Sequence, residues 1–460
     1  MNTNPLQKRS AVALFTMTSM AILFMLAVTN TALAQLTDKV KLDQLFDRLL
    51  EKNKGMGSIT IAKDGKVLYT RSFGYSQITE TMKKPLTGDT KYRIASITKT
   101  YTAVMIFQLV EEGKLKLDDH LDKFFPQIPN AGKITIAQLL SHRSGIPDLN
   151  VDDGWRSQPR THEEVIAAIA KGKPVFEPDS QHLYSNTGYV LLGYIVEKVG
   201  GKPYPEALKQ RIAAKIGLTD TYMGVGNTNP GNNESLSYRY LGVWKEAAEM
   251  NLSVPAGAGA IISTPTDMVK FIQALFDLEL VSKTSLDRMK TMRDGEGMGM
   301  ESFSFAGKTL YGHTGGSNVS GSWLAYEPEE KLAMAYTTNA KIYPVAKIVA
   351  AVFDIYWNKP YQIPTFDALE VSPEILDRYV GVYVVAGTPA KMTVIRTGST
   401  ISIGNGGTPI PLEATAPDKF TIGPGVTVEF DAAKKQMTIR RPQGERVFTK
   451  EDPGKPRSAQ

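Results

Sequence analysis

The stretch "SITKTYTAVMIFQLVEEG", residues 96–113, is the segment from which the fold of this chain can be worked out. Its apolar run predicts a helix that ends at Gly113, since glycine suits the C-terminal cap of a helix. Its first four residues, Ser96-Ile97-Thr98-Lys99, form an S-x-x-K pattern that occurs once in the chain. A chain this rich in serine and lysine can contain the pattern by chance, so its position at the start of a helix is what makes it informative.

Ser96 and Lys99 together indicate an activated nucleophile. A serine at a helix N-terminus lies among unpaired backbone N–H groups and at the positive end of the helix dipole, which favours negative charge on its oxygen. Lys99 follows one turn later on the same face, about 5–6 Å away between Cβ atoms. If burial lowers its pKa, its amine can take the Ser96 proton. The alternative is a capping serine beside a solvated lysine.

On either side of this helix, the hydrophobic pattern alternates between strands and helices. A hairpin that turns at Lys63-Asp64-Gly65-Lys66 is expected near the start, and strands are expected after Met300. Four further segments predict helices, at residues 134–148, 187–201, 264–278 and 345–357. Strands at both ends enclose a largely helical middle. This order predicts an α+β domain over residues 36–357, with one antiparallel sheet flanked by helices and an all-helical subdomain beside it.

The last quarter of the chain has a different pattern. Residues 358–373 form a proline-punctuated linker. Beyond it, residues 374–452 contain short alternating strands separated by turn residues, which is typical of a small all-β antiparallel barrel or sandwich. This segment contains no catalytic cluster, so we expect a structural or binding role for it.

The N-terminus has the pattern of an export signal. Lys8 and Arg9 precede a mostly apolar run that ends in a small-x-small site at Ala32-Leu33-Ala34. We therefore expect residues 1–34 to be a signal peptide cleaved before Gln35, which makes the protein periplasmic or secreted. The alternative is an uncleaved N-terminal anchor, because the apolar run is long for a signal peptide.

Composition excludes several functional classes. The formal charge of +6 is modest for 460 residues and the basic residues form no dense run, so no nucleic-acid partner is expected. The chain has no cysteine, which rules out disulfides and a cysteine nucleophile. Its five histidines include no pair with metal-ligand spacing on an expected element, so no metal or other cofactor is expected.

Two more short motifs carry candidate chemistry. Tyr184-Ser185-Asn186 precedes the helix expected at residues 187–201. There, a tyrosine could relay a proton near the Ser–Lys pair, and Asn186 could orient Lys99 and hold a substrate amide. The alternative is a buried tyrosine beside a helix cap. The third motif, His313-Thr314-Gly315, lies in a late strand that could run beside the Ser96 helix.

The three motifs, in this order, resemble those of the serine β-lactamases and penicillin-recognising DD-peptidases, whose elements are S-x-x-K, S-D-N and K-T-G. The tyrosine form of the second motif resembles the class C β-lactamases, their DD-peptidase relatives and related esterases. The loop "LLSHRSGIPD", residues 139–148, is also similar to one in this family. The resemblance covers about residues 36–357.

This resemblance implies roles for individual residues. Ser96 would be the acylated nucleophile, Lys99 its base partner, and Tyr184 a group that transfers protons to the leaving group and during deacylation. The backbone N–H groups of Ser96 and Gly316 would form the oxyanion hole, because glycine lets a strand edge approach a carbonyl closely. The implied substrate-binding residues are Asn186, His313, Thr314 and Gly315.

Two histidines need separate interpretation. His313 replaces the family's usual lysine, and a mostly neutral histidine attracts a substrate carboxylate less strongly and in a pH-dependent way. Esterase-like substrates therefore become more plausible, and efficient β-lactam hydrolysis less so. His142 invites a Ser–His triad, but the resemblance makes its loop structural, so we expect it to pack beside the site.

The sequence thus predicts an exported serine acyl-hydrolase that works through a Ser96 acyl-enzyme. The expected substrates are D-amino-acid peptides, cleaved as by a DD-carboxypeptidase or endopeptidase, or β-lactams, and peptidoglycan is the expected larger partner. One alternative is a carboxylesterase of the same family. The alternative from another class is a non-catalytic peptidoglycan- or peptide-binding protein, although such a protein needs neither Ser96 nor Lys99. The sequence does not determine the oligomeric state.

Overall fold

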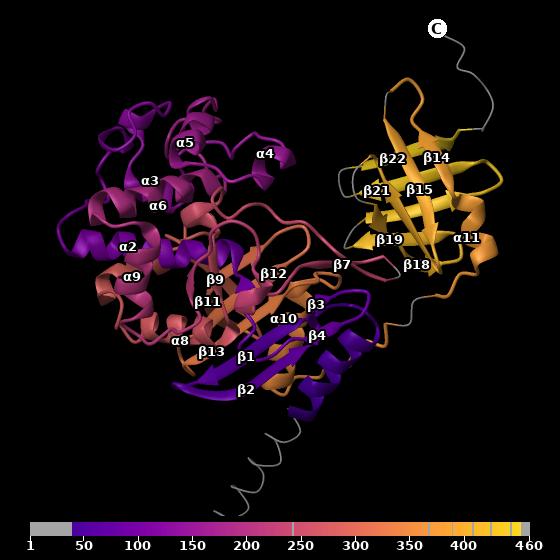
Figure 1. Ribbon diagram of the computed structural model, residues 1–460, viewed down its shortest axis with the longest axis horizontal. Helices are drawn as coiled ribbons and strands as arrows, with labels where there is room; N and C mark the ends of the chain where they lie inside the picture. Colours follow the sequence, from indigo (N-terminus) through magenta and orange to yellow (C-terminus); the bar gives the residue numbers. More distant parts are fainter. Residues whose placement is uncertain are drawn as a thin grey trace, which may run out of the picture.

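The computed structural model describes residues 39–451, apart from residues 242, 367–368, 389, 407–408, 424–425 and 442–443. The expected signal peptide and the cleavage site before Gln35 lie outside the described residues. Figure 1 shows a larger α+β part and a smaller β part at its side. A helix over residues 39–51 opens the described chain.

The larger part is built on a six-stranded antiparallel sheet with strand order β10-β11-β12-β13-β1-β2. Strand β1 comes first of these in the chain and β13 comes last, yet the two are neighbours inside the sheet, where Gly57 of β1 pairs with Thr338 of β13. This meeting confirms the α+β class predicted from the strand order along the chain. The strands are β1 (Gly57–Lys63), β2 (Lys66–Phe73), β10 (Glu301–Phe305), β11 (Lys308–Gly316), β12 (Gly321–Glu327) and β13 (Leu332–Thr338).

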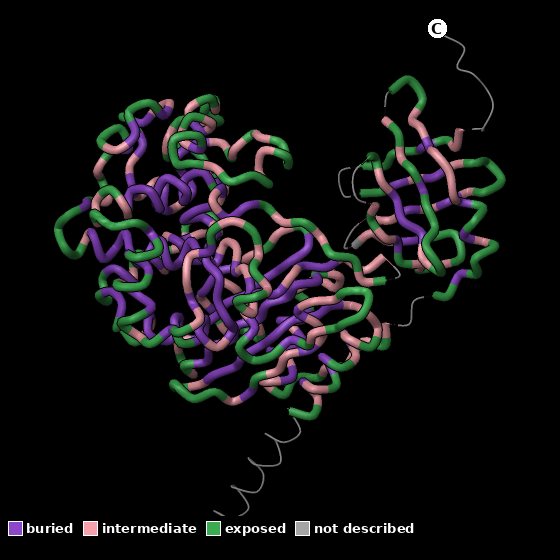
Figure 2. Tube along the Cα trace, viewed as in Figure 1, coloured by how far each residue is buried: buried purple, intermediate pink, exposed green. Residues whose placement is uncertain are grey.

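Alternation along the strands gives the sheet two buried faces. On β13, Met334 and Tyr336 pack with the 39–51 helix and with α10 (Val345–Tyr356), whereas Ala333 and Ala335 belong to the core on the other face. Alanine on that face lets α8 (Pro265–Phe276) lie close against the sheet. In Figure 2 the buried purple segments concentrate in the sheet and in the helices that cover it.

Helix α2 (Thr98–Glu111) runs through the middle of the larger core. Every residue from Thr98 to Leu109 is buried, so other elements surround this part of the helix on all sides. Its Tyr101 ring stacks on Phe271 of α8 with ring centroids 3.6 Å apart, a contact that contributes about 0.5–1.5 kcal/mol beyond area burial. This surrounding core fixes the segment that starts with Ser96.

The helical subdomain packs on the opposite side of α2 from the sheet (Figure 1). Its longest helix, α6 (Asn186–Gly200), ends at Gly201, whose φ of 69° is a left-handed cap that suits glycine. The other helices of the larger part are α3 (Ile136–Leu140), α4 (Asp153–Ser157), α5 (His162–Ala170), α7 (Tyr204–Leu208) and α9 (Lys283–Lys290). The short strands of the larger part are β3 (Tyr75–Ile78), β4 (Lys83–Pro85), β5 (Tyr92–Arg93), β6 (Tyr222–Met223), β7 (Tyr238–Tyr240), β8 (Trp244–Glu246) and β9 (Ile261–Ser263).

The smaller part is a nine-stranded antiparallel sheet that curls around its own apolar core, as predicted for a small barrel or sandwich. It also contains a helix that the strand pattern does not predict, α11 (Pro373–Tyr379). Pro373 at the first helical turn starts it, and Leu376 and Tyr379, three residues apart, bury one face of it in the barrel core. The strands are β14 (Gly381–Val384), β15 (Lys391–Thr397), β16 (Thr400–Gly404), β17 (Ile410–Pro411), β18 (Glu413–Ala416), β19 (Lys419–Gly423), β20 (Val426–Asp431), β21 (Gln436–Arg441) and β22 (Gly444–Lys450).

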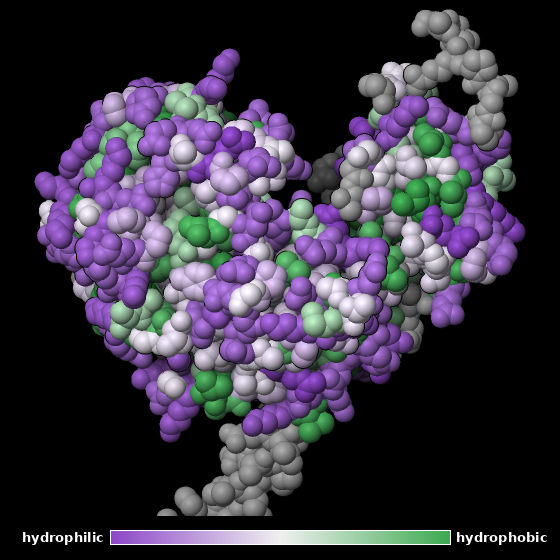
Figure 3. Space-filling view, in the orientation of Figure 1, coloured by the Kyte–Doolittle hydropathy of each residue, from purple (hydrophilic) through white to green (hydrophobic). Residues whose placement is uncertain are grey.

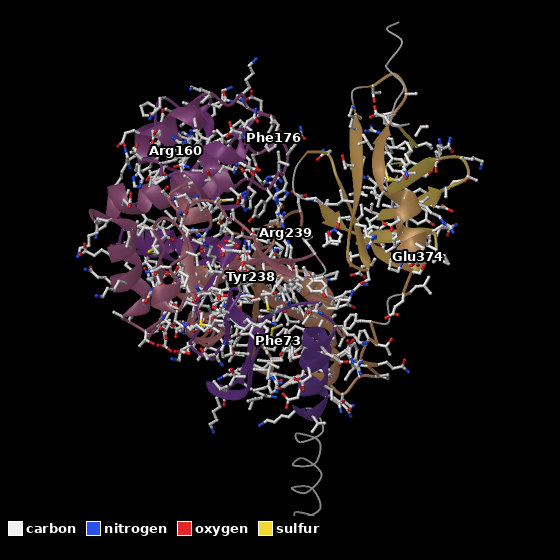
Figure 4. The ribbon with its side chains drawn as sticks, turned by 45° about the vertical axis from the view of Figure 1, so that its right-hand side comes forward. Phe73, Arg160, Phe176, Tyr238, Arg239 and Glu374 are labelled. Carbon is white, nitrogen blue, oxygen red and sulfur yellow. The ribbon has the colours of Figure 1, made fainter. Side chains whose placement is uncertain are left out.

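A broad cleft separates the barrel from the larger part, visible as a hollow in Figure 3. Its volume is about 1540 Å³. Arg239 of β7, labelled in Figure 4, lines it from the larger part, and the Lys54 Nζ bonds Glu413 Oε1 across it at 2.7 Å. Asn318, at the tip of the β11–β12 hairpin, also lines it.

Candidate active site

Ser96 lies in a single 3₁₀ turn, Ala95–Ile97, that leads into α2. Helix α2 proper begins two residues later, at Thr98. Ala95 has a φ of 47°, a left-handed conformation that costs free energy in a residue with a Cβ. Backbone pairing holds the approach in place, since the Ile94 N–H donates to Ile261 O at 3.1 Å. The strained turn therefore presents Ser96 at the head of a fully buried helix.

Lys99 connects the first two sequence motifs. Its Nζ donates to Ser96 Oγ at 2.9 Å, to Asn186 Oδ1 at 2.8 Å and to Ala258 O at 3.0 Å. The side chain has no solvent exposure. Burial lowers the pKa of Lys99 to about 7, although the carboxylates of Asp148, Glu301 and Glu296 act in the opposite direction. At neutral pH this amine can therefore both accept and return a proton, which an exposed lysine cannot do.

Tyr184 lies directly beside the pair. The Lys99 Nζ is 4.8 Å from the centre of its ring. Burial raises the pKa of Tyr184, and its hydrogen bond with Ser96 acts in the opposite direction. The phenol therefore stays protonated at neutral pH and can pass a proton between Ser96 and a reacting atom.

His142 packs behind Tyr184. The two rings stack with centroids 4.3 Å apart, and the His142 Nδ1 accepts the Ser185 N–H at 3.1 Å. Burial lowers the pKa of His142, with the Lys99 charge as the next cause, so the ring is neutral. Its Nδ1 is already used as an acceptor, and its contacts are with the tyrosine rather than with Ser96. This geometry agrees with a packing role.

Asp148 orients the second motif. Its Oδ1 accepts the backbone N–H of Asn186 at 2.6 Å and of Thr187 at 3.3 Å, at the N-terminus of α6. Its Oδ2 accepts from Asn186 Nδ2 at 2.9 Å, which leaves Asn186 Oδ1 facing Lys99. The sequence indicates a family-like loop that ends in Asp148 but gives no role for this residue. Asp148 follows Gly-Ile-Pro in the chain, and nothing in its spacing from Asn186 indicates that the two residues are in contact.

Strand β11 passes very close to Ser96 at Gly315. A Cβ on Gly315 would lie 2.3 Å from Ile94 O and 3.2 Å from Ser96 N, so no side chain fits there. The next residue, Gly316, lines the same cavity as Ser96. The third motif therefore meets the first through backbone rather than through side chains.

His313 is buried in the structure whereas Thr314 is partly exposed, and a substrate-binding role for the two residues stays a prediction. His313 is 1% exposed, its ring centre is 6.3 Å from that of Tyr184, and it does not line the cavity beside Ser96. The reason is strand alternation: Tyr311, His313 and Gly315 share the face toward the helices, and Tyr184 covers His313. Burial lowers the pKa of His313, and the Glu301 charge opposes this shift.

Two acidic residues beside the third motif were not singled out from the sequence. Glu301 accepts from Thr314 N at 2.9 Å and from Thr314 Oγ1 at 3.1 Å, and its Oε1 is 3.6 Å from His313 Nδ1. Glu296 forms an antiparallel bridge with Glu301. Burial, and next the Glu301 charge, raises the pKa of Glu296 to about 7. In the sequence both residues look like part of a polar loop, so only their folded position marks them.

A cavity of about 300 Å³ adjoins Ser96. Its charged wall contains Arg156, whose Nη2 donates to Leu149 O at 2.6 Å, and Arg93, whose Nε is 3.3 Å from Glu249 Oε2. Its apolar wall consists of Leu149, Val190, Met250, Leu252, Val254 and Pro255. The cavity can therefore hold a small, largely apolar group next to the Ser96 hydroxyl.

Among the residues that the structure describes, no cluster of three or more acidic or histidine side chains is arranged to hold a metal ion. Within the same residues, no helix has both the length and the apolar character needed to span a bilayer.

Comparisons with known proteins agree with this geometry. The Beta-lactamase family model matches residues 42–353. Penicillin-binding protein 4* of Bacillus subtilis (strain 168) is 30% identical, covering 76% of this chain and 84% of that protein. D-alanyl-D-alanine-carboxypeptidase/endopeptidase AmpH of Escherichia coli (strain K12) is 28% identical, covering 54% of this chain and 65% of that protein. The solved D-amino acid amidase from Ochrobactrum anthropi SV3 is 29% identical with a TM-score of 0.62, covering 70% of this chain and 98% of that one.

Proposed function

The chain belongs to the Beta-lactamase family and is a serine hydrolase, and from this premise we propose that Ser96 forms an acyl-enzyme with D-amino-acid peptides or amides. The observation that carries the proposal is the 2.9 Å contact between Lys99 Nζ and Ser96 Oγ, in a site that lowers the lysine pKa to about 7. A non-catalytic binding protein would have no need to bury a lysine against a serine, because burying an amine costs free energy.

The acylation step uses Ser96, Lys99 and Tyr184 in turn. Neutral Lys99 takes the Ser96 hydroxyl proton as Oγ attacks the carbonyl carbon, forming the C–O bond. The C–N bond then breaks, and the departing nitrogen receives a proton through Tyr184 from the lysine. Water next attacks the ester carbon and its proton passes to Lys99 through Tyr184; the C–Oγ bond then breaks, Ser96 Oγ takes that proton, and the acid product leaves.

The backbone of the third motif supports the developing negative charge. We assign the oxyanion hole to the N–H groups of Ser96 and Gly316. Gly315 supports this assignment, because its missing side chain allows β11 to approach within contact of Ser96 N. Removal of one such donor typically costs a factor of about 10²–10³ in kcat.

The proposed substrate class rests on the cavity and on the relatives. A cavity of about 300 Å³ with an apolar wall suits a small aliphatic side chain on the acyl group. The chain's relatives include a D-alanyl-D-alanine-carboxypeptidase/endopeptidase and a D-amino acid amidase. Together these favour a short D-amino acid residue on the acyl side of the cleaved bond, with cell-wall peptide as the natural source.

The proposal includes two points of organisation. The hydrolase domain is assigned to residues 36–357 and the β domain to residues 374–452, supported by their separate apolar cores. Export is supported by the basic, apolar and small-x-small pattern of residues 1–34.

The proposal can be tested with D-alanine p-nitroanilide, which releases a coloured, uncharged amine. We expect turnover by the wild type, a covalent D-alanyl adduct on Ser96 by mass spectrometry, and loss of both in Ser96→Ala. Ser320→Ala is the matched control, because this serine lines the same cavity without contacting Lys99. Wild-type turnover that survives in Ser96→Ala would sink the assignment of the nucleophile.

A further inference from the structure

We propose that Glu301 makes the leaving-group side of this site selective against carboxylates, so that the cleaved bond is followed by an uncharged or cationic group rather than a free C-terminal amino acid. This inference rests on the proposed function and narrows its substrate class. It separates an amidase, endopeptidase or esterase specificity from a carboxypeptidase specificity.

The position of the leaving group follows from the proton that it must receive during acylation. The acyl side chain fits the cavity lined by Leu149 and Val190, and the departing atom must lie near Tyr184 and Lys99. Tyr184 is the side chain that covers His313 of β11. Glu301 binds Thr314 of β11, and the charges of Glu296 and Glu301 act on Tyr184, so a leaving group that departs past Tyr184 passes these acidic side chains.

The two side chains of β11 that could bind a carboxylate are not available to one. Thr314 donates both its amide and its hydroxyl to Glu301, at 2.9 and 3.1 Å. His313 is buried behind Tyr184, with Nδ1 2.5 Å from Thr314 O. It is also neutral, since burial lowers its pKa. A substrate carboxylate would thus meet the Glu301 carboxylate where it needs a donor.

The surrounding charges reinforce this exclusion. Tyr184 is faced by Lys99 from α2, by Asp148 from the loop before α6, and by Glu296 and Glu301, whose charges act on its pKa. The Lys99 ammonium is already held by three acceptors. The carboxylates of Glu301 and Asp148, together with Glu296 in its ionised form, therefore repel a further negative group.

Arg93 and Arg156 line the cavity assigned to the acyl side chain. Lys341, beside β11, is a further cation that could offset this repulsion, but its position does not suit that role. Its Nζ donates to Ser317 O at 2.5 Å and would be 3.6 Å from a Cβ on Gly316. The Cβ direction of Gly315 points at Ser96, and neighbouring strand residues point to opposite faces. Lys341 therefore lies across β11 from Ser96.

The experiment compares two substrates that share one scissile bond. N-acetyl-D-alanyl-D-alanine carries a terminal carboxylate, and its C-terminal N-methylamide does not. Release of N-acetyl-D-alanine from each is followed by mass spectrometry with the full-length protein. We expect kcat/KM to be at least tenfold higher for the methylamide in the wild type. Glu301→Gln keeps an acceptor for Thr314 and should narrow this ratio at least threefold, mainly by faster cleavage of the acid.

Two matched variants separate local from general charge effects. Glu80→Gln removes an exposed carboxylate in the turn between β3 and β4 and should leave the ratio unchanged. Lys341→Gln should also leave it unchanged, whereas a selective loss of acid cleavage would show that Lys341 binds the carboxylate and would overturn the proposal.

The remaining outcomes are decisive as well. Equal cleavage of the two substrates by the wild type overturns the inference, and this arm needs no folded variant. A folded Glu301→Gln protein with an unchanged ratio overturns the role of Glu301. If neither substrate is cleaved in a Ser96-dependent manner, the proposed function itself is refuted, and the inference with it.

Discussion

Asp148 holds Asn186 by two contacts, one to its backbone N–H at 2.6 Å and one to its side-chain Nδ2 at 2.9 Å. The two residues lie 38 positions apart in the chain. Because Nδ2 is committed to Asp148, Oδ1 is turned toward Lys99, which it accepts from at 2.8 Å. One carboxylate thus caps α6 and sets the position of the lysine that contacts Ser96.

Asp148→Asn tests this positioning role. The variant removes the negative charge that raises the pKa of Lys99, so that pKa should fall below about 7. Neutral lysine would then persist to lower pH, and the acid limb of the kcat/KM profile should shift to lower pH. We expect kcat to fall about 10–100-fold with less change in KM, as when a partner that orients a functional group is lost. A variant that only loses stability would keep the wild-type pH profile.

Lys99→Ala should lower the rate of acylation by about three or more powers of ten, because the serine loses the group that takes its proton. Lys99→Arg is the matched control: it keeps a cation but cannot deprotonate at neutral pH. Both variants should therefore be inactive in a p-nitroanilide assay. For the wild type, kcat/KM should rise with pH through about 7, as Lys99 loses its proton. An active Lys99→Arg protein would contradict the base role.

Gly315→Ala should disturb the site more than Gly316→Ala. The added methyl at position 315 meets the backbone oxygen of Ile94 at 2.3 Å, whereas at position 316 the nearest atom is Ser320 O at 3.2 Å. Overpacking of this kind costs about 1–3 kcal/mol of unfolding free energy. Urea denaturation measures this cost, and the rate of acylation should fall with it. Equal stability of the two variants would show that β11 can shift away from Ser96 without cost.

His142 should contribute to a loss of stability in mild acid. Burial lowers its pKa, so between 6.5 and the lower folded value the unfolded chain binds a proton that the folded protein does not. The free energy of unfolding should then decrease as pH falls below 6.5, by up to about 1.4 kcal/mol per pH unit for one such group. His142→Phe keeps a ring against Tyr184 and should show a shallower decrease between pH 6.5 and 5. Identical slopes in urea titrations would exclude this contribution.

The predictions from sequence succeeded where the signal is local. The hairpin around Asp64-Gly65, the helix that ends at Gly201 and the strands after Met300 all depend on side-chain periodicity and turn residues close together in the chain. They did not predict α11, because its start at Ser372-Pro373 looks like the end of a linker. Only the burial of Leu376 and Tyr379 in the barrel core identifies it as a helix. They also placed Ser96 at the opening of α2, although a separate 3₁₀ turn carries it.

By itself, the sequence determined the α+β class, the order of the three motifs and the candidate pair Ser96 and Lys99. These features depend on hydrophobic periodicity and on spacings between residues that are close together in the chain. Only the tertiary structure decided what surrounds that pair. In the folded chain, His313 lies beside Tyr184, Asp148 binds Asn186, and Glu301 accepts a hydrogen bond from Thr314. Burial and charge depend on segments that are distant in sequence and adjacent in space. For that reason the pKa of Lys99, and the polarity offered to the substrate, could not be derived from the motifs alone.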